Sequence, residues 1–150
     1  MGIIRLETFI HAPVETCFDL SRSVDLHQTS AQQTDERAIA GVTSGLMNLD
    51  DVVTWEARHF GIRQRLTVKI TAFQRPHHFR DSQVSGIFHS FDHDHYFEEK
   101  NDGTVMKDVF RFQCPLGVLG TMADPVVTRH LRNFLETRNR VIKQVAETKV

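Results

Sequence analysis

The chain has 150 residues, 40% of them apolar and 25% charged, so we expect one globular domain over residues 1–150. Its 18 basic and 19 acidic residues nearly cancel, which argues against nucleic acid as a partner. No apolar run reaches the roughly 18 residues of a membrane span. Arg5 and Glu7 interrupt the apolar segment that a secretory signal needs, and we expect Cys17 and Cys114 to be reduced core thiols. These features predict a cytoplasmic protein.

The first thirty residues predict one strand followed by two short helices. Residues 3–10 alternate apolar and polar side chains, which is typical of a strand. Pro13 suits the first turn of a helix, and Ser23 is a good N-cap for a second helix over residues 24–31. Two short helices directly after the first strand are a distinctive topological feature.

The middle of the chain predicts a series of antiparallel strands. Apolar and polar residues alternate in several segments, as expected for strands with one buried face. Gly61 and the Asp102-Gly103 pair indicate turns between neighbouring strands. The predicted strands cover residues 36–41, 51–60, 62–73, 78–85, 88–98 and 104–114.

A long amphipathic helix is predicted at the end of the chain. Asp124 followed by Pro125 is the pattern of an N-cap and a first-turn proline, so we expect the helix to begin there. Residues 116–123 are predicted to form a separate short helical turn. The apolar side chains that follow recur with a period near 3.6: Val127, Leu131, Phe134, Leu135, Ile142 and Val145.

This order of elements resembles the helix-grip fold of the SRPBCC superfamily, which includes START domains and polyketide cyclases. The resemblance is carried by FIHAPVETCFDLSRSVDLH, VTWEARHFG, RPHHFRDSQVSGIFHSFDHDHYF and DVFRFQCPLGVLG. The third and fourth segments are similar to a bacterial branch labelled polyketide cyclase/dehydrase-like or cell-division-inhibitor-like. The resemblance implies an α+β protein. A curved antiparallel sheet of about seven strands would wrap around the C-terminal helix and enclose a cavity.

In such a fold, one face of each strand lines the cavity. Phe91 and Phe97 place the odd residues of their strand inward, and His93 and His95 share that face. The same reasoning on the other strands gives the predicted ligand-binding residues. They are Trp55, His59, Gln64, Leu66, Asp81, Phe91, His93, His95, Phe97, Asp108, Phe110 and Phe112.

The inward polar side chains suggest several functions. Burying them without partners would cost about 2–7 kcal/mol each, so they must pair with one another, with water or with a ligand. The hairpin around Gly103 brings His93 or His95 close to Asp108, and these three residues are the catalytic candidates. An imidazole held by a carboxylate is suited to general acid–base catalysis.

We therefore consider four alternatives. The leading hypothesis is a protein, a monomer or homodimer, that binds a small hydrophobic or aromatic molecule, lipid-like or polyketide-like. The second is a cyclase/dehydratase-type enzyme with a His–Asp pair. The third is a metal-dependent enzyme using His93 and His95, with further ligands from His59 or Asp108. The fourth is a partner-binding module with a filled core. No cofactor is assigned, and whether the protein is an enzyme stays open.

The remaining histidines are expected to contribute less. His27 lies near the expected cavity mouth, where it could contact a ligand or simply face solvent. The others are predicted to be exposed: His11, His77, His78, His89 and His130.

Overall fold

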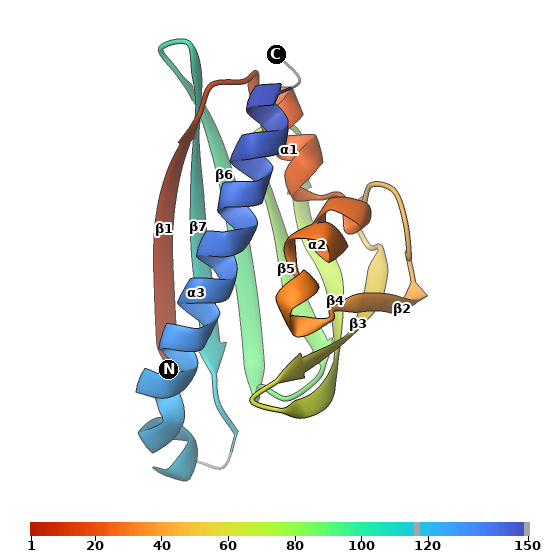
Figure 1. The fold of residues 1–150 in the computed structure, drawn as a ribbon, viewed down its shortest axis with the longest axis vertical. Helices are drawn as coiled ribbons and strands as arrows, with labels where there is room; N and C mark the ends of the chain where they lie inside the picture. Colours follow the sequence, from red (N-terminus) through yellow and green to blue (C-terminus); the bar gives the residue numbers. More distant parts are fainter. Residues whose placement is uncertain (116–117, 149–150) are drawn as a thin grey trace.

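Seven antiparallel strands form one curved sheet that wraps around a long C-terminal helix (Figure 1). The structure, a computed structural model, describes residues 1–115 and 118–148, except for the side chains of Gln33 and of residues 118–124. The strand order is β1-β7-β6-β5-β4-β3-β2. The strands are β1 (Gly2–Ile10), β2 (Arg37–Gly41), β3 (Val52–His59), β4 (Ile62–Gln74), β5 (His78–Ser85), β6 (Ser90–Lys100) and β7 (Gly103–Gln113).

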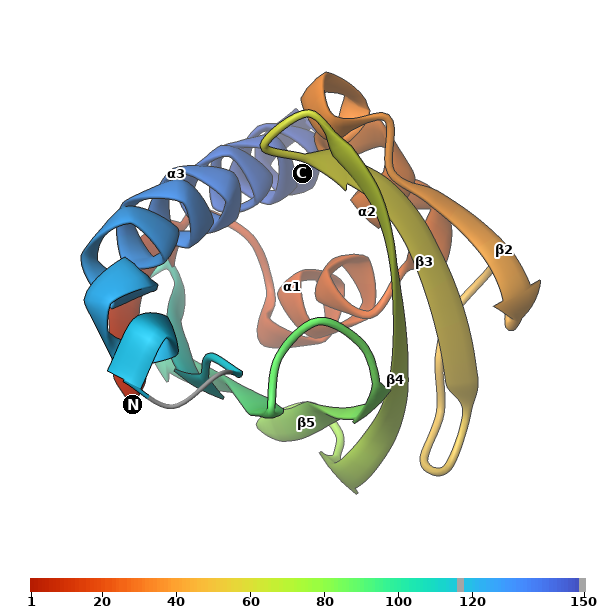
Figure 2. The same ribbon diagram turned by 90° about the horizontal axis from the view of Figure 1, so that it is seen from below.

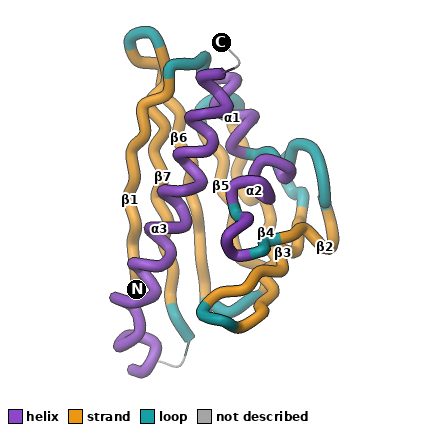
Figure 3. Tube along the Cα trace, in the orientation of Figure 1, coloured by secondary structure: helices purple, strands orange, loops and turns teal. Residues whose placement is uncertain are grey.

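Two short helices follow β1, as predicted. They are α1 (Val14–Ser21) and α2 (Val24–Ser30), with a short 3-10 turn after them at Gln32–Thr34. The hydroxyl of Ser23 accepts a hydrogen bond from the backbone N–H of Leu26, which confirms Ser23 as the N-cap of α2. Both helices pack against the C-terminal half of α3 (Figure 3). Viewed from below, α1 lies across the far end of the space between sheet and helix (Figure 2).

The helix α3 (Val118–Thr148) begins earlier than predicted. Its backbone runs without a break through Pro125, so the predicted helix start at Asp124 and Pro125 was wrong. Proline removes one backbone N–H donor but does not by itself end a helix that tertiary packing holds. The apolar face of Val127, Leu131 and Leu135 supplies that packing. Residues 116 and 117 of the predicted separate turn lie outside the described residues.

The predicted strand faces are confirmed. Phe91, His93, His95 and Phe97 are all at most 5% exposed on the concave side of the sheet. Irregularities in register between β2 and β3 and between β4 and β5 accompany the curvature of the sheet.

One end of the fold is filled by aromatic rings. Phe18 of α1 packs edge-on against Phe73, Phe79 and Phe97, with ring centroids 5.3–5.4 Å apart. Cys17 is buried beside Phe18, which confirms the prediction of a core thiol, and its burial raises its pKa. This end is a packed core, so any open space must lie toward the other end of α3.

None of the described helices has a segment both long and apolar enough to cross a membrane.

Two glycines provide a matched test of the sheet edge. Gly41 and Gly61 have almost the same left-handed backbone, with φ of 74° and 76°. A methyl group on Gly41 would collide with the carbonyl oxygen of Val52. Around a methyl group on Gly61, none of the described atoms lies within 4 Å apart from those of the glycine and its two chain neighbours. We expect Gly61→Ala to lower the free energy of unfolding by about 1–2 kcal/mol. Gly41→Ala should cost roughly 1–3 kcal/mol more, measured by urea denaturation. An equal decrease in the free energy of unfolding in the two variants would contradict the close contact of Gly41 in β2 with Val52 in β3.

Candidate functional site

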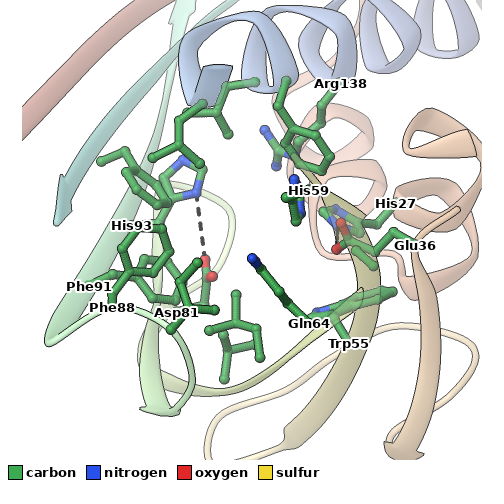
Figure 4. Close-up of a pocket in the computed structure, with 18 of the residues that line it drawn as sticks. His27, Glu36, Trp55, His59, Gln64, Asp81, Phe88, Phe91, His93 and Arg138 are labelled. Carbon is green, nitrogen blue, oxygen red and sulfur yellow. Dashed lines mark hydrogen bonds and ion pairs between the residues drawn. The ribbon is translucent and has the colours of Figure 1, made fainter. Parts of the chain in front are cut away.

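An internal cavity of ≈ 470 Å³ lies between the concave face of the sheet and α3 (Figure 4). Phe60 and Ile87 line it and are themselves 56% and 40% exposed, so the cavity reaches the surface near the β3–β4 and β5–β6 turns. Most of the wall is apolar. The apolar side chains include Trp55, Leu66, Val68, Ile70, Phe79, Phe91, Phe110, Leu131, Phe134 and Leu135.

Most of the residues predicted to bind a ligand line this cavity. These residues are Trp55, His59, Gln64, Leu66, Asp81, Phe91, His93, His95 and Phe110. Phe97, Asp108 and Phe112 face the concave side but do not line the cavity. Phe97 is covered by Phe18, and Phe112 lies against the backbone of Gly2. Asp108 lies behind His93, fully buried.

The predicted pairing of a histidine with Asp108 is present. The Nε2 atom of His93 lies 2.7 Å from Oδ1 of Asp108. Asn139 donates to Oδ2 of the same carboxylate at 2.7 Å, and Arg138 approaches Oδ1 at 3.4 Å. Burial alone would raise the pKa of Asp108, but the hydrogen bond from His93 and the charge of Arg138 lower it well below its usual range.

The ionised Asp108 sets the tautomer of His93. Because a carboxylate only accepts hydrogen bonds, Nε2 of neutral His93 carries the proton. Its Nδ1 is then an acceptor. That atom faces Asp81 across the cavity wall, 4.0 Å from Oδ1 (Figure 4).

His95 stacks on His93 and bonds to Asp81. The two imidazole centroids are 3.8 Å apart. Arg138 donates to Nδ1 of His95 at 3.3 Å, so Nε2 carries the proton and donates it to Asp81 at 2.7 Å. Burial, the positive charge that His93 has when it is protonated and the charge of Arg138 lower the pKa of His95 well below its ordinary value, which keeps His95 neutral. Burial raises the pKa of Asp81 against the opposing charges of His93 and Arg138.

Arg138 and Asn139 were missed by the sequence reasoning. Both are buried in α3, at 4% and 3% exposure. A signal for them was present, since Leu135, Arg138 and Ile142 follow the 3-and-4 spacing of one helix face. A charged residue at such a position indicates a buried partner on the sheet, which here is Asp108.

Polar pairs also lie on the wall opposite Asp81. His59 and His130 share a hydrogen bond of 2.8 Å between Nδ1 and Nε2, and burial lowers the pKa of both. The prediction that His130 is exposed was therefore wrong, because α3 turns it toward the tip of β3. His27 also lines the cavity, where it bonds to Glu36 at 2.7 Å and lies 4.4 Å from the Trp55 ring.

Gln64 stands apart from these pairs. Its carboxamide points into the cavity (Figure 4), and its side chain makes no hydrogen bond to the described part of the chain. It is thus a polar group of the wall that is available to a ligand.

The predicted exposure of the other histidines is only partly correct. His11, His77 and His89 are exposed. His78 instead bonds at 2.7 Å to Asp94, a fully buried carboxylate on the convex face that Arg80 also contacts at 2.8 Å. Asp94 keeps a lowered pKa because these two partners outweigh its burial. The other predicted core thiol, Cys114, is only partly buried and lines the cavity.

Comparison with known proteins identifies the fold. No family model matches the chain, and no curated protein matches its sequence. Protein TTHA0849 from Thermus thermophilus is similar in structure, with a TM-score of 0.78 and 14% identity over 95% of both chains. A START superfamily protein from Mycobacterium smegmatis has a TM-score of 0.73 and 11% identity over 99% of both chains.

The di-domain ARO/CYC StfQ, from the steffimycin biosynthetic pathway, is a third similar structure. It gives a TM-score of 0.76 and 11% identity over 98% of this chain and 51% of StfQ. The chain therefore has the START-like helix-grip fold that its sequence resembles. At these identities the likeness establishes the fold alone.

The buried carboxylate at the site makes a prediction about stability. Asp108→Asn should lower the free energy of unfolding by about 3–5 kcal/mol at neutral pH, because it leaves Arg138 buried without its counter-charge. The lowered pKa of Asp108 means that its ionisation stabilises the fold fully above about pH 4 and less as the pH falls further. The difference between wild type and variant should therefore shrink on acidification, as measured by urea unfolding at several pH values.

Asp92→Asn on the neighbouring strand β6 is the control, since Asp92 is exposed. It should change the free energy of unfolding by no more than about 0.5 kcal/mol. A difference between wild type and Asp108→Asn that grows toward low pH would contradict the described ionisation.

Proposed function

We propose that the protein binds one small hydrophobic or aromatic molecule, lipid-like or polyketide-like, with an oxygen-bearing group directed toward Asp81 and His93. The observation that carries this proposal is the apolar cavity of ≈ 470 Å³ with a few polar groups facing into it. Its size falls within the range of about 300–1,000 Å³ typical of ligand pockets. A mostly apolar lining with a few polar groups is also typical of such pockets. Each Å² of apolar ligand surface removed from water would contribute about 25 cal/mol.

The electrostatics of the cavity favour a neutral ligand. Arg138 and Asp108 offset each other, and both already have partners within the protein. The imidazole of His95 is kept neutral, and the raised pKa of Asp81 favours its neutral form. A ligand hydroxyl could donate to Nδ1 of His93, and a ligand hydroxyl or carbonyl oxygen could accept a hydrogen bond from neutral Asp81 or from the carboxamide of Gln64. The likeness to StfQ, an ARO/CYC of a biosynthetic pathway, supports a small organic molecule of this kind.

Blocking the cavity tests this proposal. Ala57 lines the cavity and is 4% exposed, so Ala57→Phe would place a ring in the ligand space. With 2-naphthol as the test ligand, we expect one binding site in the wild type and affinity at least about tenfold weaker in Ala57→Phe, measured by calorimetry. Ile39→Phe is the control, since Ile39 is exposed on β2 and does not line the cavity. Equal affinity in both folded variants would place 2-naphthol outside the cavity and contradict the proposal.

A second candidate function is acid–base catalysis of the cyclase/dehydratase type. The observation that favours it is the geometry of His93, whose Nε2 is fixed by Asp108 while Nδ1 faces the cavity. Nδ1 could remove a proton from the carbon next to a ligand carbonyl. Asp81, whose pKa is raised, could give its proton to the carbonyl oxygen as the enol forms. His93 and Asp81 would thus act as base and acid on one bound carbonyl compound.

Proton exchange measures this chemistry without the natural substrate. We expect the wild type to accelerate exchange of the α-hydrogens of 2-tetralone with D2O, followed by NMR. His93→Gln should abolish the acceleration while it retains 2-naphthol binding, because a glutamine amide can still donate to Asp108. His89→Gln, at an exposed position, should exchange at the wild-type rate. Acceleration that survives in His93→Gln would exclude His93 as the base.

A further inference from the structure

We propose that Asp81, His93 and His95 form a binding site for one divalent first-row transition metal ion, with Zn²⁺ as the best match, at the cavity wall. Each of the three residues offers one ligand atom, and these atoms lie within 4.8 Å of one another. Two imidazole nitrogens and one carboxylate oxygen are the donors found in catalytic zinc sites, which keep a further position open. All three residues line the cavity, so the open position would face it.

The sheet holds these residues in a fixed relation. His93 and His95 are two residues apart on β6 and therefore project from the same face. Asp81 is directly opposite His93 on the neighbouring strand β5. The three donors thus come from adjacent positions of one antiparallel pair, where the backbone cannot easily separate them. This arrangement favours a preformed site over one assembled from loops.

The surroundings of His93 match those of a metal ligand. Histidines that bind a metal through one nitrogen almost always donate the other N–H to a carboxylate, a carbonyl or water. His93 does so through Nε2, which lies 2.7 Å from the ionised Asp108. Its Nδ1 is left for the ion. Asp108 is held in turn by Asn139 at 2.7 Å.

Small side-chain rotations would complete the geometry. Zinc with bonds of about 2.0–2.1 Å at tetrahedral angles separates its ligand atoms by about 3.3 Å. Oδ1 of Asp81 is now 2.7 Å from Nε2 of His95 and 4.0 Å from Nδ1 of His93. The first distance must open and the second must close, each by about 0.7 Å or less, and the two imidazole nitrogens, which lie within 4.8 Å of each other, must approach by up to about 1.5 Å. Such shifts are within reach of χ rotations of the three side chains.

Binding would also move one proton on His95. Its Nε2 would give up the proton now donated to Asp81, and Nδ1 would carry one instead. Oδ1 of Asp108 lies 3.5 Å from Nδ1 and can accept a hydrogen bond from the N–H formed there. Arg138 would then lose its 3.3 Å contact with Nδ1 but keep Asn139 and the carbonyl of Ser21 as acceptors. The charges of Arg138 and Asp108 offset each other. Asp81 would release its proton to solvent when it binds as a carboxylate, and it would then offset one of the two positive charges of the ion.

The structure changes the metal hypothesis drawn from the sequence. The third ligand was expected from His59 or Asp108, but neither belongs to the cluster. His59 bonds to His130, and Asp108 lies behind His93. An ion here would bind the oxygen of a cavity ligand, which goes beyond the proposed hydrophobic binding. It would also occupy Nδ1 of His93, so acid–base catalysis by that atom requires the metal-free protein.

Metal titration without any organic ligand tests the site. Protein dialysed against a chelator is titrated with Co²⁺, followed by its visible absorption, and the bound Co²⁺ is then displaced with Zn²⁺. We expect one Co²⁺ per chain, a visible absorption band typical of four- or five-coordinate Co²⁺, and full displacement of the Co²⁺ by Zn²⁺. Asp81→Asn keeps the shape of the side chain. It should weaken Zn²⁺ binding by about 10–100-fold or more, because loss of a residue that only hydrogen-bonds to a metal ligand already lowers metal affinity by that factor. His95→Gln is the second variant and should lose the band.

His11→Gln and His89→Gln are matched controls, because both histidines are exposed. They should bind Co²⁺ like the wild type. Absence of stoichiometric Co²⁺ binding, wild-type affinity in folded Asp81→Asn, or loss of the band in either control would overturn the proposal. Binding of 2-naphthol is measured separately, so failure of the metal site leaves the proposed ligand cavity standing.

Discussion

The buried carboxylate of Asp108 is the interaction on which the rest of the structure depends. An ionised group without solvent must have partners, and Asp108 finds them on two different elements. His93 of β6 and the pair Arg138 and Asn139 of α3 all bond to it. The carboxylate therefore ties the C-terminal helix to the sheet. Because Arg138 also reaches His95, the same contact fixes the orientation of both inward histidines.

Asp108 and its partners His93, Arg138 and Asn139 form a polar cluster between α3 and the sheet, and the position of this cluster determines where the cavity lies. Phenylalanine rings around Phe18 fill the end covered by α1. Beyond the cluster, α3 and the sheet are separated by an apolar space into which Asp81 and His93 project (Figure 4). A second polar pair, His59 and His130, joins the tip of β3 to α3 near the exposed Phe60. The molecule thus combines a rigid polar wall with an apolar volume that is accessible from one end.

The sequence predicted the strands and their faces well because that information is local. Alternation around Phe91 and Phe97 places His93 and His95 inward whatever the rest of the chain does. The missed features depend on packing between distant elements. Arg138 becomes a partner of Asp108 only when α3 crosses β7, and His130 meets His59 only because α3 passes the tip of β3. The predicted helix start at Pro125 was wrong, because tertiary contacts outweigh the local tendency of proline to interrupt a helix.

A crystal structure of the complex with 2-naphthol would show whether the cavity binds a ligand with its oxygen toward Asp81 and His93, because it locates both the apolar and the polar part of the ligand. We expect the two rings to lie between Phe91, Phe110 and the apolar face of α3, with the hydroxyl within hydrogen-bond distance of Asp81 or His93. A ligand found only on the outer surface, or with its hydroxyl directed away from these two residues, would contradict this expectation.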